Sequence, residues 1–182
     1  MNNEEKLIAK AKAGEREAFG VLYDNYVSGI YRFVLIKVGS KADAEDLTHQ
    51  VFLNAWQKIG RYISKGFPFS SWLYRIAQNA VIDFYRTNKK HVDIDAIPED
   101  ALSDKPEFDR QIDNAMQVRL VHSTLKELDQ DQQSVLIMRF VNELTNKEVA
   151  QALGKSEGAV RVIQHRALKQ LRAKIDETTR FN

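Results

Sequence analysis

Residues 145–172 restrict the fold more than any other part of the chain, because they predict two short helices around a tight turn. Thr145 can N-cap the first helix, and Glu148 follows three residues later, as a capping box requires. Gly154 is suited to end that helix, because glycine adopts a positive φ at little cost. Ser156 can then cap the second helix. The segment therefore predicts a helix-turn-helix.

The second of these helices has one apolar and one basic side. The apolar residues recur at helical spacing and predict a single buried stripe: Val160, Ile163, Ala167 and Leu171. The remaining faces carry long polar or basic side chains: Arg161, Gln164, His165, Arg166, Lys169 and Arg172. A helix with a packed back and a basic front suits the major groove of DNA. The same pattern also fits a plain helical hairpin whose basic face is solvated.

Composition limits the kinds of chemistry that this chain can carry out. Its 182 residues suffice for one or two domains. The absence of cysteine excludes disulfides and thiolate metal sites, and the four histidines show no ligand spacing, so no metal or cofactor is expected. Residues 1–12 do not resemble a signal peptide, and no apolar run approaches the ~18 residues of a membrane span. We therefore expect a cytoplasmic protein without membrane insertion.

Charge is distributed unevenly along the chain. The net charge of +2 combines +5 in residues 1–90, −6 in residues 91–115 and +3 in residues 116–182. Two basic segments that flank an acidic one suit a polyanionic partner, although a net charge this small is weak support.

The hydrophobic pattern predicts an all-α protein. Apolar residues recur at three- and four-residue steps in these segments: 4–13, 17–38, 42–59, 72–87, 114–128 and 132–141. Ser71 is expected to cap the fourth helix, and Asp129 or Asp131 the sixth. Periodicity fades in the acidic segment, which contains two prolines. We therefore predict an N-terminal domain over residues 1–90, a flexible acidic linker over 91–115 and a C-terminal domain over 116–182.

Aromatic and basic residues alternate between Arg61 and Arg86. The aromatic residues are Tyr62, Phe67, Phe69, Trp72 and Tyr74, and the cations between them are Arg61, Lys65, Arg75 and Arg86. Rings that stack on unpaired bases and cations that neutralise phosphates are how single strands are held. The alternative is that the aromatic residues belong to the core of a small bundle. Asn79 and Asp83, four residues apart on one helical face, could likewise read base edges or simply be solvated.

The helix that begins near Asp43 suggests a protein partner. Its acidic start favours the helix N-terminus. Beyond it we expect His49, Gln50 and Phe52 to be partly exposed, and an exposed phenylalanine beside polar residues is typical of an interface. Nowhere in the sequence is there a glycine-rich phosphate loop, a nucleophile elbow or a zinc-protease motif, so we do not expect an enzyme.

Three of these segments together resemble a bacterial RNA polymerase sigma factor of the sigma-70 family, in the extracytoplasmic-function (ECF) group. The segment 43–56, DAEDLTHQVFLNAW, is similar to the family's polymerase-binding helix. The segment 69–86, FSSWLYRIAQNAVIDFYR, is similar to its promoter-melting segment, and the helix-turn-helix is the third match. Three long motifs in the family's order are far more specific than a helix-turn-helix alone.

The resemblance implies a transcription initiation factor that binds core RNA polymerase and directs it to promoters. It implies that the following residues contact the β′ coiled coil: Asp46, His49, Gln50, Phe52 and Trp56. The −35 element would be read as duplex by Ser156, Glu157, Ala159, Arg161, Val162, His165, Arg166 and Lys169. The melted −10 element would be held as single-stranded DNA, with a flipped-out base captured by the 61–70 loop; the residues are Arg61, Lys65, Phe67, Phe69, Trp72, Asn79, Asp83 and Arg86.

Further partners follow from the same resemblance. The C-terminal domain would also contact the β flap of polymerase, the linker would thread through the polymerase cleft, and an anti-sigma factor would hold the protein inactive. Two alternatives remain at this point: a helix-turn-helix regulator that binds duplex DNA without polymerase, and a helical enzyme or interaction module. The sigma-factor interpretation requires Arg161 and Arg166 to be exposed and the chain to have two separable halves.

Overall fold

The computed structural model describes residues 3–87 and 123–180, and every regular element in these ranges is helical. The predicted all-α fold is therefore confirmed. The predicted linker, 91–115, and the larger part of the helix expected at 114–128 lie outside the described residues; of that helix, 123–126 are described and are helical.

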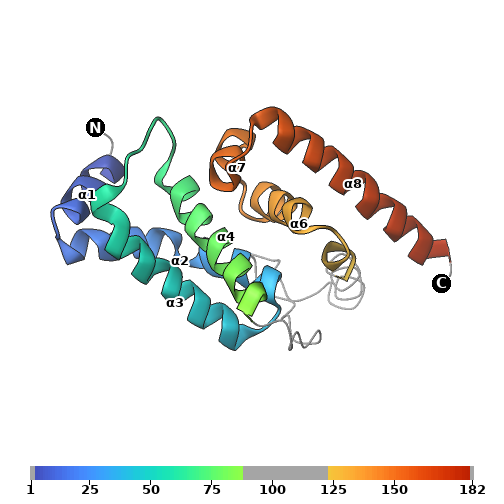
Figure 1. Cartoon of the computed structure of the whole chain (residues 1–182), viewed down its shortest axis with the longest axis horizontal. Helices are drawn as coiled ribbons and strands as arrows, with labels where there is room; N and C mark the ends of the chain where they lie inside the picture. The colour runs from blue at the N-terminus through green and yellow to red at the C-terminus, as the bar shows by residue number, and fades with distance from the viewer. Residues whose placement is uncertain (1–2, 88–122, 181–182) are drawn as a thin grey trace, which may run out of the picture.

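The N-terminal half is a bundle of four helices with one short 3-10 turn (Figure 1). Its elements are α1 (Asn3–Lys12), α2 (Arg16–Val38), α3 (Lys41–Lys58), η1 (Ile59–Arg61) and α4 (Phe69–Thr87). Gly39, with a φ of 79°, ends α2, and the Ser40 hydroxyl accepts a hydrogen bond from the Asp43 amide at 3.3 Å to start α3. The long helices bury a continuous apolar core that includes Leu22, Phe33 and Val51.

The start of α4 differs from the prediction. Ser71 does not cap the helix, because α4 already begins at Phe69 and encloses Ser71 within its first turn. The Ser71 hydroxyl is buried and has no hydrogen-bond partner among the described residues. Pro68 explains the earlier start, since proline favours the first turn of a helix, where an amide would have no partner in any case.

The C-terminal half holds the helix-turn-helix. Its elements are α6 (Gln130–Leu136), η3 (Ile137–Val141), α7 (Asn146–Leu153) and α8 (Glu157–Arg180). Asp129 caps α6 by accepting from the Gln132 amide at 2.8 Å, and Gln132 completes a capping box. The helix predicted at 132–141 therefore starts two residues earlier than expected and widens to a π-helix over its last turn.

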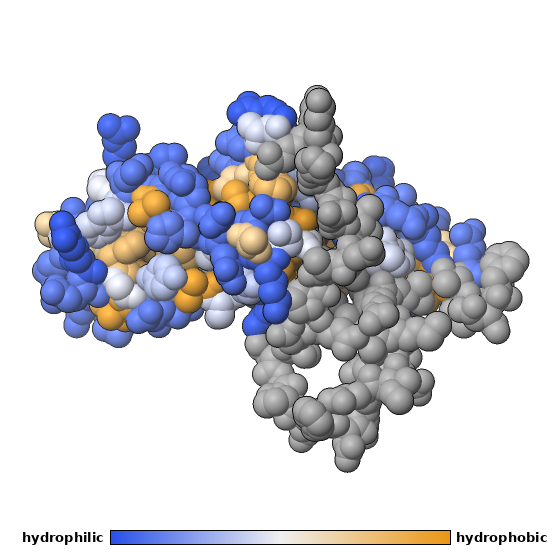
Figure 2. Space-filling view, turned by 90° about the horizontal axis from the view of Figure 1, so that it is seen from below, coloured by the Kyte–Doolittle hydropathy of each residue, from blue (hydrophilic) through white to orange (hydrophobic). Residues whose placement is uncertain are grey.

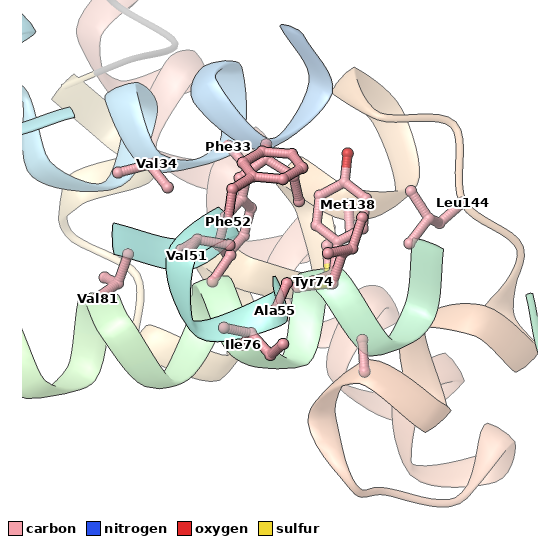
Figure 3. Close-up of a cluster of buried hydrophobic side chains, with 14 of the residues drawn as sticks. Phe33, Val34, Val51, Phe52, Ala55, Tyr74, Ile76, Val81, Met138 and Leu144 are labelled. Carbon is pink, nitrogen blue, oxygen red and sulfur yellow. The ribbon is translucent and has the colours of Figure 1, made fainter. Parts of the chain in front are cut away.

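The two halves pack against each other across α4, which lies between α3 and α7 (Figure 1). Figure 3 shows Met138 and Leu144 of the C-terminal half beside Tyr74 of α4, in the same buried cluster as Phe33. The Asn142 side-chain amide also donates to the Gly29 carbonyl of α2 at 3.0 Å. The sequence suggested two halves held together by a linker alone; instead they share apolar core.

A second, polar contact joins the halves at Lys37. Its ammonium lies 2.6 Å from Gln130 Oε1 and 3.1 Å from Ser134 Oγ, both on α6. The Ser134 hydroxyl in turn lies 2.9 Å from Gln78 Oε1 of α4. Lys37, Ser134 and Gln78 are all buried, and with Gln130 they form what we call the Lys37 cluster.

Candidate nucleic-acid and polymerase interfaces

The expected polymerase-binding residues lie on and beside an exposed face of α3. Asp46, His49 and Gln50 are exposed, as the sequence suggested. The prediction that Phe52 is partly exposed is wrong: it is only 4% exposed, because it shares the inward face of α3 with Thr48. Its ring packs edge-on against Tyr23 of α2, with the ring centroids 4.7 Å apart.

A groove of about 270 Å³ lies between α2 and α3 at this place. Its lining residues are Arg16, Phe19, Tyr23, His49, Phe52, Leu53 and Trp56. Leu53 is 42% exposed and supplies the accessible apolar surface that sequence analysis assigned to Phe52. Apolar patches of this kind interrupt the mainly hydrophilic surface of the described residues (Figure 2). Phe19 and Tyr23 were expected only in the core; their spacing on α2 did not reveal that one edge of each ring borders a groove.

The loop between η1 and α4 is held in a defined shape. Lys65 and Gly66 have φ values of 46° and 78°, which make a tight turn, and the Phe67 amide donates to the Ser64 carbonyl at 2.8 Å. The Lys12 ammonium donates to the Tyr62 carbonyl at 2.9 Å and so ties the loop to α1. A loop fixed in this way can present side chains without first becoming ordered.

The aromatic residues of this loop divide into buried and accessible ones. Phe69 is 1% exposed and packs with Tyr62 and Trp72, at centroid distances of 5.2 and 5.3 Å. Its ring cannot reach a base in this structure, so the direct DNA contact expected of Phe69 is corrected to a supporting role beneath the loop. Trp72 and Phe67 are partly exposed, and Arg61 and Lys65 are fully on the surface.

Sequence analysis missed Ile63, which is 70% exposed at the loop. Its position directly before the polar residues Ser64 and Lys65 was the available signal, because a large apolar residue at the polar end of a loop has little to pack against.

The exposed face of α4 carries the expected polar residues. Asn79, Asp83 and Arg86 are all exposed. Asp83 forms an ion pair with Arg86 at 3.1 Å, and both side chains are well solvated, so the pair contributes little to stability and can exchange partners. Ile82, which directly precedes Asp83, is also exposed and adds an apolar side chain at the edge of this face.

The helix-turn-helix has the local geometry that its sequence predicts. The Thr145 hydroxyl accepts from the Glu148 amide at 3.2 Å, and the capping box is complete. Gly154 has a φ of 65°, and the Ser156 hydroxyl accepts from the Ala159 amide at 3.1 Å to start α8. These caps fix the turn and hence the direction of α8.

The two sides of α8 are separated as predicted. Val160 and Ala167 are fully buried, while Ile163 and Leu171 are half-buried against the rest of the domain. Seven of the eight residues expected to read the −35 element are exposed: Ser156, Glu157, Arg161, Val162, His165, Arg166 and Lys169. Ala159 is half-buried. Arg161 is within 3.5 Å of the Glu157 carboxylate, which orients it along the helix surface.

Comparison with known proteins assigns both halves to one family. A model of sigma-70 region 2 matches residues 22–91, and a model of sigma-70 region 4 matches residues 124–173. The ECF RNA polymerase sigma factor SigD of Mycobacterium bovis is 32% identical over 175 residues, which cover 93% of this chain and 82% of SigD. This chain is an ECF sigma factor of the sigma-70 family. The ECF sigma factor BldN of Streptomyces coelicolor is 35% identical over 91% of this chain, which spans only 63% of BldN.

Solved structures share the fold. CnrH, in complex with the cytosolic domain of CnrY, is 24% identical and superposes with a TM-score of 0.75 over 97% of this chain and 99% of that chain. RpoE of Bartonella quintana, in complex with the anti-sigma factor NepR, is 19% identical, with a TM-score of 0.67 over 87% of this chain and 96% of that chain. Both matches extend over the two halves.

The family places the interfaces in their regions. As an ECF sigma factor, this protein directs RNA polymerase to promoters through regions 2 and 4 and has no enzymatic activity of its own. The α3 and α4 faces belong to region 2, and the basic side of α8 belongs to region 4. The domain boundaries predicted at 90/91 and 115/116 stay a prediction. Within the described ranges, no helix is both long and apolar enough to span a bilayer, and no cluster of potential metal ligands occurs.

Proposed function

We propose that α8 of region 4 enters the major groove of the −35 element. What supports this most is the exposure of Arg161 and Arg166 on a helix whose opposite side is firmly packed. Arginines on such a helix can reach guanine edges and phosphates without unfolding the domain. His165 and Lys169 extend the same surface, with Val162 able to contact a thymine methyl group.

We propose that the loop and the outer face of α4 hold the melted −10 element. Arg61, Lys65 and Arg86 would neutralise phosphates, and the accessible edges of Phe67 and Trp72 would stack on bases. Asn79 and Asp83 would hydrogen-bond to base edges, with Asp83 exchanging its Arg86 partner for a base amino group. Phe69 would support this surface from below.

We propose that the groove between α2 and α3 receives the β′ coiled coil of core polymerase. Its apolar floor, formed by Phe52 and Trp56, is bordered by exposed Asp46, His49 and Gln50, the combination of apolar centre and polar rim that protein interfaces show. Region 4 would contact the β flap, and an anti-sigma factor would hold the protein inactive, as suggested by RpoE, which shares the fold and forms a complex with the anti-sigma factor NepR. With such partners the protein would act in the cytoplasm.

Arg166→Ala tests the −35 assignment. Losing one base or phosphate contact should weaken binding of holoenzyme to a −35-containing promoter by ~1–3 kcal/mol, or about 5- to 150-fold. Binding to core polymerase should not change. Gel-shift titration and pull-down measure the two properties, and run-off transcription reports the combined outcome.

Arg172→Ala is the matched control, because Arg172 is an exposed arginine on α8 outside the proposed reading surface. If both substitutions lowered promoter affinity equally, the proposal of a specific role for Arg166 would be wrong. Binding of the free chain to duplex promoter DNA, with normal affinity and no need for polymerase, would instead favour an ordinary helix-turn-helix regulator.

A further inference from the structure

Among the residues that the structure describes, the buried cation at the domain boundary has hydrogen-bond partners from only one side. Lys37 is 3% exposed, and its ammonium is 2.6 Å from Gln130 Oε1, 3.3 Å from the Gln130 carbonyl and 3.1 Å from Ser134 Oγ. All three acceptors belong to region 4, while Lys37 belongs to region 2. When the domains part, the ammonium therefore loses these partners and gains water.

The partners within the Lys37 cluster are neutral. The Ser134 hydroxyl has one proton to donate, which Gln78 Oε1 at 2.9 Å and the Gln130 carbonyl at 2.7 Å share. Among the described residues, the carboxylates that influence Lys37 are Asp131 and Asp129, which act through their charge and not through a hydrogen bond. Neutral acceptors return less than the hydration that a buried cation loses. In keeping with this, burial lowers the pKa of Lys37 to about 8.

We call the arrangement in which region 4 packs against region 2 the closed state. If both promoter elements are contacted as proposed, the closed state cannot reach them at the same time. The −35 and −10 positions are separated by ~25 base pairs, or on the order of 85 Å of duplex at 3.4 Å per pair. A compact protein of this length has a radius of gyration of only ~16 Å. The domains must therefore separate, and segment 88–122 could at full extension span on the order of 100 Å.

We propose that the Lys37 cluster keeps the docking of region 4 on region 2 reversible. The shared apolar core favours the closed state, and the buried cation opposes it, so the two states remain close enough in free energy for polymerase to select the open one. An apolar residue at position 37 would remove this opposition and hold the chain closed.

Lys37→Met is the decisive variant, because methionine keeps most of the lysine stem and removes the charge. The substitution leaves no buried acceptor without a partner. Gln130 is exposed and can bind water, and the Ser134 hydroxyl still donates to Gln78 Oε1. Ser134→Ala acts in the opposite direction, because it takes one acceptor from Lys37 and the donor from buried Gln78. Lys58→Met, at an exposed lysine of α3, is the control for charge alone.

Domain separation can be followed in the full-length chain. The protein has no cysteine, so Lys6→Cys and Gln170→Cys, both at exposed positions, give one fluorophore in each half. Energy transfer between them, measured without polymerase or DNA, reports the closed population independently of the proposed promoter contacts. Stopped-flow mixing with core polymerase then gives the association and dissociation rate constants.

We expect Lys37→Met to raise energy transfer and to slow association with core polymerase roughly tenfold, because only the open fraction binds. Its dissociation rate should not change, whereas loss of a direct contact would accelerate dissociation. Ser134→Ala should lower energy transfer and speed association, and Lys58→Met should do neither.

Reduced energy transfer in Lys37→Met would overturn the proposal, since Lys37 would then hold the domains together. Unchanged energy transfer in both cluster variants would overturn it as well. Circular dichroism checks folding. Should Lys37→Met fail to fold, Lys37→Gln takes its place, because it also removes the charge and is expected to raise energy transfer, whereas a fall in energy transfer would again overturn the proposal.

Discussion

Lys37 lies near the end of α2 among buried apolar neighbours, and its position sets a measurable pH dependence. Its pKa of about 8 in the folded protein is lowered mainly by burial, while Asp129 and Asp131 partly counteract this; Tyr85 donates a hydrogen bond to its backbone carbonyl. The unfolded chain keeps the ordinary lysine pKa of about 10.4. Below pH 8 both states are protonated, and the buried charge is a constant cost.

We expect the free energy of unfolding to rise between pH 7.5 and 9.5. In that window the folded protein releases the Lys37 proton while the unfolded chain retains it, so higher pH favours folding, with a slope of at most ~1.4 kcal/mol per pH unit. Above pH 10 the trend should reverse, because burial raises the pKa of Tyr62 and Tyr85 and their ionisation then favours unfolding. Urea unfolding at the two pH values measures the rise, which Lys37→Met should abolish; an equal rise in that variant would assign it to another group.

The exposure of residues on the outer helix faces could be predicted from the sequence, but some buried positions could not. Arg161 and Arg166 follow from helical spacing alone, because their stripe partners fix which side faces outward. Phe52 and Phe69 were expected at the surface, yet each lies one helical step from a position that is exposed. The spacing of apolar residues does not show which of two adjacent positions at the edge of an apolar helix face is buried. The helix that packs against this face determines which ring is covered.

Helix ends show the same contrast at the scale of the element. The caps of α7 and α8 could be predicted, since Thr145, Gly154 and Ser156 act through their immediate neighbours. The start of α4 could not, because Pro68 and Ser71 are both acceptable start signals. The π-helical turn of η3 also escaped prediction, because no local residue type requires it.

Two glycines, one in the turn that ends α7 and one within α2, should respond oppositely to substitution by alanine. Gly154→Ala places a side chain at a φ of 65°, with its Cβ 3.3 Å from Arg75 Nη2, and should lower stability by ~1–2 kcal/mol. Gly20→Ala lies within α2, where nothing is within 4 Å, and should raise stability by ~0.5–1 kcal/mol through reduced backbone entropy of the unfolded chain.

Thermal unfolding of the two variants, followed by circular dichroism, measures the difference. Because the substitutions are identical, Gly20→Ala is the control for the added methyl group. A loss of stability at Gly20, or none at Gly154, would contradict the backbone assignment at that glycine.

For the whole molecule, the main departure from the sequence interpretation is that the halves touch. Two domains of the expected kinds are present, and family models match each separately. Their contact could not be predicted, since no local pattern marks Gln78, Gln130 and Ser134 as contact residues, and they come together only where α2, α4 and α6 meet. From the sequence, Met138 and Leu144 are ordinary core residues of the C-terminal half. In the structure they pack into a core that also contains Tyr74 of α4 (Figure 3).

Docking that is nearly balanced in free energy should couple the unfolding of the two halves only weakly. We expect two overlapping calorimetric transitions, so that the measured enthalpy exceeds the van't Hoff enthalpy. Asn142→Ala removes the hydrogen bond to the Gly29 carbonyl and should separate the two transitions further. A single transition with equal enthalpies in the unsubstituted protein would show that the halves unfold as one unit.

The contact between Lys147 of α7 and the ring of Phe67, 5.3 Å from ammonium to centroid, has a consequence for how promoter DNA meets this protein. The base of a nucleotide can stack on the Phe67 ring in place of the Lys147 ammonium. The phosphate of the same nucleotide can pair with the Lys147 ammonium in place of the ring. A strand held by the loop as proposed would therefore compete with Lys147 of region 4 for Phe67, and its arrival would favour separation of the two domains.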